Sequence, residues 1–215
     1  MPVSGNKKEL QRWYPLVFAA LLVLVQAFFP TEGFFQSVIS VMVFYVICPF
    51  LFFFLVLKGS FQDLFFKKGS LREGLLWSFI SIVFSFLVLI AFSQYTDFLV
   101  QYRIPLAATE SFGSFLGYEL GSVSFFTAVY IFFFGAFVLS SVKIENVWKR
   151  SLGVTVFFAA ALLLTGNLRW EFLPYLVFSY LGGVATLKSG SLIYSLLAQW
   201  LLIVLLDTFM VIIRT

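Results

Sequence analysis

Long apolar runs are the feature that most constrains how this chain can fold. The longer runs match the roughly 20 apolar residues that a transmembrane helix needs. Hydrophobic residues make up 61% of the 215-residue chain and charged residues only 11%, which excludes a water-soluble core. We therefore predict an all-α fold, a polytopic transmembrane helical bundle of about seven spans. The seven runs are residues 15–29, 34–57, 75–92, 122–142, 151–164, 173–186 and 192–213.

The runs lie so close together that no separate soluble domain fits between them. We predict one membrane-embedded domain, 1–215, with N-terminal helices and an outer loop in 1–121 and a core in 122–215. The runs 151–164 and 173–186 are short for spanning, which indicates a thinned bilayer, tilted neighbours or shielding by protein. The bulky sequence Phe28-Phe29-Pro30 offers no small-residue cleavage site, so the first run is predicted to be a retained helix.

Basic residues predict the orientation of the chain in the membrane. If alternate loops lie on alternate sides, 11 of the 14 Lys and Arg residues fall on one side and only Arg103, Arg169 and Arg214 on the other. The positive side is cytoplasmic by the positive-inside rule. The sequence thus predicts a multi-pass protein of the cell membrane (the cytoplasmic or inner membrane) with a cytoplasmic N-terminus and a C-terminus outside.

Residues for metal binding and acid–base chemistry are scarce. The chain has no histidine, and its single cysteine, Cys48, lies in an apolar run. Histidine is the commonest metal ligand and the commonest general base near neutral pH. We therefore expect no metal and no cofactor. The Lys and Arg residues cluster in short loops, which suits membrane topology and contact with lipids better than nucleic-acid binding.

Two loops carry further patterns. Between the second and third runs, Phe and Leu alternate with charged residues over 58–68, which predicts a short helix in the cytoplasmic headgroup layer. The long outer loop, 93–121, is a candidate lid or partner contact. In it Gly113, Gly117 and Gly121 recur at four-residue spacing, so on a helix they form a flat strip that packs against either a neighbouring helix or another protein.

Polar residues near the outer membrane surface form a second candidate site. Asp207 lies in the last run. An ionisable residue within a span either has a functional role or is neutralised by an ion pair or hydrogen bond with another residue. Glu119, Asn167 and Arg169 fall on the same outer side and complete a candidate polar cluster. We expect Asp207 to face the protein interior and to pair with Arg169 or a donor such as Asn167. A proton relay or ligand site is the alternative.

From Phe125 to Asp207 the order of features resembles the CAAX-protease and bacteriocin-processing family, the intramembrane glutamic-type proteases often called CPBP proteins. The stretch 129–137, VYIFFFGAF, is similar to the family's first motif, which has two glutamates, an arginine and a glycine, here matched by Gly135. The stretch 158–162, FAAAL, resembles the second motif, with Phe158 retained and Leu162 in place of histidine. The stretch 187–199 resembles the turn and helix that present the last histidine, and has Gln199 there.

The resemblance implies a relative that has lost its catalytic side chains. In the family, glutamates and histidines activate a water molecule for peptide cleavage. The corresponding side chains here are apolar, phenolic or amide and cannot do so. These degenerate positions are Val129, Tyr130, Phe134, Leu162, Gln199 and Ile203.

We therefore expect a pseudoenzyme, a protease-like scaffold or adaptor that binds a partner membrane protein, an apolar peptide or a lipid. One alternative is a small transporter or channel component that uses the outer polar cluster. Another is an active intramembrane protease whose catalytic residues lie elsewhere, at Glu119 or Asp207. A transporter needs a continuous polar path, and the runs supply few central polar groups beyond Gln199.

Overall fold

The computed structural model describes residues 4–30 and 32–214, and these residues form helices and no strand. Five helices are long and apolar enough to cross a membrane, which indicates a membrane protein. Two helical segments are shorter: the apolar part of α1 (Ser4–Phe28) covers Trp13–Phe28, and α11 (Leu173–Ser189) has 17 residues. The five long helices are Phe34–Val56, Leu71–Ser93, Phe112–Ser141, Val147–Leu164 and Leu192–Ile213.

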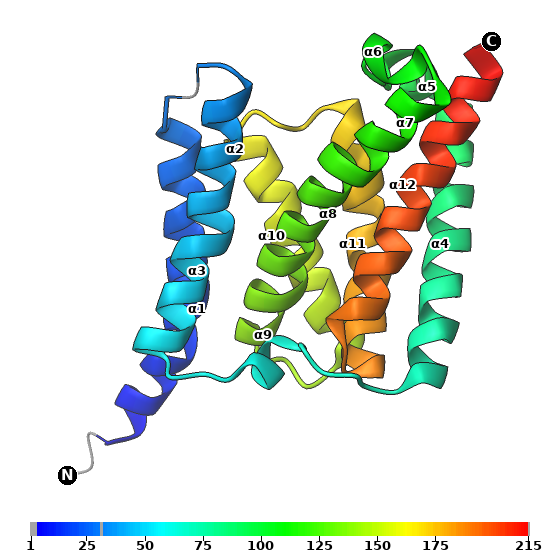
Figure 1. The fold of residues 1–215 in the computed structure, drawn as a ribbon. Coiled ribbons are helices and arrows are strands. Elements are labelled where there is room, and N and C mark those ends of the chain that lie inside the picture. The colour runs from blue at the N-terminus through cyan, green and yellow to red at the C-terminus, as the bar shows by residue number, and fades with distance from the viewer. Residues whose placement is uncertain (1–3, 31, 215) are drawn as a thin grey trace.

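The helices form an upright bundle (Figure 1). On one side, α1 pairs with the second span, which comprises α2 (Phe34–Met42), η1 (Val43–Ile47), α3 (Cys48–Leu51) and η2 (Phe52–Val56). Toward the other side, α11 packs against α4 (Leu71–Ser93), α10 (Val147–Leu164) and α12 (Leu192–Arg214). The chain enters α1 at one end of the bundle and leaves α12 at the opposite end.

The most buried span is continuous from Phe112 to Ser141. It comprises α7 (Phe112–Tyr118), η4 (Glu119–Val123), α8 (Ser124–Tyr130), η5 (Ile131–Val138) and α9 (Leu139–Ser141). It begins ten residues before the predicted start at 122, because Ser111 caps the helix by accepting a hydrogen bond from the Ser114 backbone N–H. The predicted outer loop is therefore shorter, and it contains α5 (Phe98–Gln101) and α6 (Leu106–Thr109).

Glycines allow α10, α11, α4 and α12 to approach closely. A Cβ at Gly183 in α11 would lie 2.3 Å from the Ser151 Oγ of α10. A Cβ at Gly74 in α4 would lie 2.4 Å from the ring of Tyr194 in α12. Real Cβ atoms do not come that close to their neighbours, so only glycine permits these helix contacts.

Loop 57–70 docks on the turn between α11 and α12. Its only helical turn is η3 (Phe61–Leu64), a four-residue 3₁₀ helix, so the expected headgroup-layer helix is short and Leu64 is fully buried in the core. The backbone N–H of Ser70 donates to the Ser189 carbonyl at 2.8 Å, and that of Leu192 donates to the Phe65 carbonyl at 3.0 Å. These bonds hold the loop against the end of the bundle.

The two short apolar runs both belong to longer helices. Helix α10 starts at Val147, where Asn146 caps it, and its 18 residues meet the length of a span. Helix α11 extends to Ser189 and ends at Gly190, whose φ of +70° lies in the left-handed region.

Candidate functional site

The positions that resemble the protease motifs lie in the core. All six degenerate positions, Val129, Tyr130, Phe134, Leu162, Gln199 and Ile203, are 5% exposed or less. The Tyr130 and Phe134 rings lie nearly parallel with centroids 6.2 Å apart, and the Phe134 ring lies 4.3 Å from that of Phe158. Aromatic side chains therefore fill the region where the resemblance would place catalytic groups.

This central region leaves only a small void, of about 20 Å³. Tyr130, Phe134 and Gln199 line it together with the hydroxyl side chains of Thr186 and Ser195, and no carboxyl group is among the lining residues. A void of that size is on the order of a single water molecule. It cannot admit a peptide.

Helix α12 passes α7 near the upper end of the bundle in Figure 1 and contacts η4, and each of these two contacting elements, α12 and η4, carries a buried acidic side chain. Glu119 begins η4 and Asp207 lies in α12, and each is 1% exposed. The two carboxyl groups are close enough to interact electrostatically, but neither Glu119 carboxyl oxygen has a hydrogen-bond partner among the described residues. Two ionised carboxylates buried so close together would repel each other, so one of the two is expected to carry a proton.

Tyr102, which follows α5, donates a hydrogen bond to this carboxyl pair. Its hydroxyl donates to Asp207 Oδ1 at 2.6 Å, although the two residues are 105 positions apart. Burial, and then the adjacent Asp207 carboxylate, raises the pKa of Tyr102 well above its ordinary value. The phenol therefore keeps its proton and remains a donor. We call Glu119, Asp207 and Tyr102 the carboxyl cluster.

Asp207 is buried and pairs with a donor as predicted, but the donor is Tyr102 and neither of the two residues named in the prediction. The described residues show no ion pair between Asp207 and Arg169. Asn167 donates instead to Thr165 Oγ1 at 3.1 Å. The structure thus brings together two of the four residues of the predicted polar cluster.

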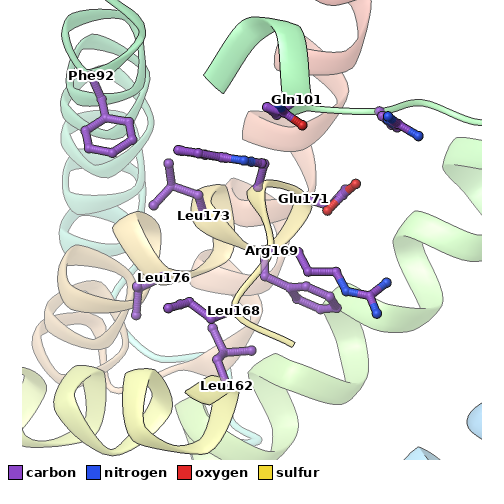
Figure 2. Close-up of a pocket in the computed structure, with 11 residues that line it drawn as sticks. Phe92, Gln101, Leu162, Leu168, Arg169, Glu171, Leu173 and Leu176 are labelled. Carbon is purple, nitrogen blue, oxygen red and sulfur yellow. The ribbon is translucent and has the colours of Figure 1, made fainter. Parts of the chain in front are cut away.

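Arg169 lines a separate cavity of about 620 Å³. The cavity lies where α4, α10 and α11 end or begin at the upper end of the bundle in Figure 1. We call it the outer cavity because the sequence predicts that this end faces outside. In Figure 2 Leu162, Leu168 and Leu176 gather at one end of the cavity, whereas Gln101, Glu171 and the Arg169 guanidinium lie away from them. Leu162, one of the degenerate positions, therefore faces the outer cavity rather than the central void.

The glycine strip lies on α7 and η4 and is exposed. A Cβ at Gly117 or Gly121 would meet no atom within 4 Å, and one at Gly113 would approach only Ser111 Oγ, at 3.8 Å. The expectation of internal packing at these glycines was therefore wrong. The close helix contacts of the bundle use Gly74 and Gly183 instead.

Comparisons with protein-family models, with curated proteins and with solved structures find no match for this chain. The resemblance to the CPBP proteases therefore rests on the motifs of the sequence alone. Among the side chains that the structure describes, those of residues 13–30 and 32–213, no three Cys, Asp or Glu groups come together as metal ligands would.

Proposed function

We propose that this protein is a non-catalytic, multi-pass membrane scaffold that binds a partner membrane protein. The observation that carries the proposal is the closed centre, with aromatic rings around a void of about 20 Å³ and no carboxyl group lining it. A protease needs a general base and room for a peptide, and a transporter needs a polar path. The centre offers neither a general base with room for a peptide nor a polar path. We therefore expect the functional contacts at the surface.

The same closed centre suits descent from a CPBP-like protease. Tyr130, Phe134 and Gln199, which stand at degenerate positions, line the void. Bulky rings there fill volume that a substrate would otherwise occupy. In this proposal seven helices cross the cell membrane, with the N-terminus in the cytoplasm and the C-terminus outside, and the protease-like scaffold persists without its chemistry.

The glycine strip is the surface on which we place the partner. Gly117 and Gly121 are exposed and one helical turn apart, and the exposed Leu116 and Leu120 flank them. Inside a bilayer the hydrophobic effect does not drive helices together, because lipid tails are as apolar as the helix surfaces. Helices associate there through close packing at small residues. An uncovered strip of this kind fits a transmembrane helix of another protein.

Photo-crosslinking in native membranes tests this placement. A photoreactive side chain at Leu120, 57% exposed beside the strip, is expected to capture one discrete polypeptide. The matched control is Leu87 in α4, 59% exposed, which is expected to capture only lipid. Gly117→Leu should abolish the Leu120 product without unfolding the protein, because the added Cβ has open space around it.

Three results of this experiment would count against the proposal. A product of twice the chain's own mass would identify a second copy in place of a partner protein. No polypeptide at Leu120 would remove the docking surface. A Leu120 product that survives Gly117→Leu would show that the strip does not make the contact.

A second candidate function is a hydrolase that uses the carboxyl cluster. Aspartic proteases activate water with two neighbouring carboxyl groups that share a proton, and Glu119 and Asp207 are two buried neighbouring carboxyl groups. Both side chains are 1% exposed, so the cluster would have to open before a substrate could enter. Peptide cleavage by the purified protein that is lost in Glu119→Gln would support this candidate over the scaffold.

A further inference from the structure

The outer cavity combines positive charge with apolar walls. Arg103 and Arg169 both line it, and they are two of the three basic residues predicted on the outer side of the membrane. Neither guanidinium forms an ion pair among the described residues. Glu171 is the one acidic residue among the lining side chains, so the charged groups of the cavity sum to +1.

The apolar side of the cavity continues onto the lipid-facing surface. Leu168 lines the cavity and is 53% exposed. Leu163 and Leu164, at the nearby end of α10, are 62% and 56% exposed. Trp170 also lines the cavity, and tryptophan favours the boundary between headgroups and acyl chains. The cavity is therefore open to acyl chains along one side and carries its arginines on another.

We propose that the outer cavity binds one phospholipid with a net negative headgroup, its phosphate between Arg103 and Arg169 and an acyl chain along Leu168. Guanidinium groups bind phosphate oxygens through paired, charge-assisted hydrogen bonds. The bilayer is as apolar as the cavity walls, so chain contacts give little preference between lipids. The two arginines therefore set the selectivity.

This lipid site is independent of the proposed partner surface. The cavity is lined by the ends of α4 and α10, by Gln101 and Arg103 in and after α5, and by residues 168–176 up to the start of α11, whereas the glycine strip lies on α7 and η4. Loss of lipid binding would leave crosslinking at Leu120 intact, and loss of the partner would leave lipid binding intact. Failures of the two proposals can thus be told apart.

The test measures the melting temperature of the full-length protein in mild detergent with added phosphatidylglycerol, phosphatidylcholine or inorganic phosphate. A ligand that binds only the folded state raises the melting temperature with concentration. We expect phosphatidylglycerol to stabilise the protein more than phosphatidylcholine, and inorganic phosphate to have no effect because it makes no use of the apolar walls.

Variants of the two arginines test whether phosphatidylglycerol binds in the outer cavity. Arg103→Gln and Arg169→Gln should each weaken phosphatidylglycerol binding by about tenfold, and the double variant by about a hundredfold, as expected for loss of charged hydrogen bonds. Arg72→Gln, an exposed arginine at the other end of α4, is the matched control and should bind as the unaltered protein does. Mass spectrometry of co-purified lipid provides a second readout that does not depend on the melting temperature.

Several outcomes would overturn the proposal. Equal stabilisation by inorganic phosphate would make a free anion the ligand in place of a lipid. Equal stabilisation by phosphatidylcholine would remove the role of net headgroup charge. Full binding of phosphatidylglycerol by the double variant, in either readout, would place the lipid elsewhere.

Discussion

The hydrogen bond from Tyr102 to Asp207 supports a specific prediction about stability. Tyr102→Phe removes the hydroxyl and keeps the ring, so the change leaves no large cavity. Tyr102 is 5% exposed and Asp207 1%, and the bond is 2.6 Å long. A buried hydrogen bond to a charged group contributes about 1.5–3 kcal/mol, and we expect Tyr102→Phe to lower the free energy of unfolding by about 2 kcal/mol.

The assay is reversible unfolding in mild detergent, with melting temperature as a second measure. For a chain of this size about 2 kcal/mol corresponds to roughly 4–8 °C. Tyr95→Phe is the matched control, because Tyr95 is 89% exposed, and it should change stability little.

A double-mutant cycle shows whether the hydroxyl acts through Asp207. In an Asp207→Asn background the acceptor is neutral, so Tyr102→Phe should cost about 1 kcal/mol or less. The same loss in both backgrounds would refute the reasoning, because the Tyr102 hydroxyl would then be stabilising something other than the carboxylate.

Three further predictions follow from the fold. Gly183→Ala should destabilise the protein, because its Cβ would lie 2.3 Å from Ser151 Oγ. Gly117→Ala, the control, should leave the melting temperature unchanged or raise it. An equal loss of melting temperature in the two variants would contradict the packing of α10 on α11. The Ser60 backbone N–H, and then its hydroxyl, lowers the pKa of Asp63, so the stability that Asp63 contributes is present at neutral pH and is lost as the pH falls through the lowered folded-state pKa. The melting temperatures of the unaltered protein and Asp63→Asn should therefore differ at neutral pH and converge as the pH falls below the lowered pKa of Asp63, and a constant difference would contradict this. Reporter fusions are expected to place the N-terminus in the cytoplasm and the C-terminus outside, and a result with both on one side would contradict seven spans.

The sequence predicted the spans well where a run is apolar throughout and ends in polar residues. The structure begins its second long helix at Phe34 and ends its last apolar span at Ile213, as the runs indicated. The helix from Phe112 was missed because its first two turns contain Gly113 and Gly117, which are typical of loops. Ser111 was the available signal, since serine is a favoured N-cap residue.

The candidate site was harder to predict, because it depends on contacts that spacing does not determine. The sequence suggested Arg169 as a partner of Asp207 because the two residues carry opposite charges. The observed donor is the neutral hydroxyl of Tyr102, which lies in a different loop. The four-residue spacing of the glycines correctly indicates a flat strip on a helix. It carries no information on whether another helix of the same chain covers that strip, and none does at Gly117 or Gly121.

Chemical access to Gln199 is the most direct test of the closed centre on which the scaffold proposal depends. In a Cys48→Ser background, Gln199→Cys places a thiol at a residue that is 2% exposed and lines a void of about 20 Å³. A small, membrane-permeant thiol reagent should label Tyr95→Cys, at the 89% exposed control position, within minutes and leave Gln199→Cys unlabelled in the folded protein. Rapid labelling of Gln199→Cys, with the melting temperature unchanged, would show that a substrate can reach the centre and would contradict the account.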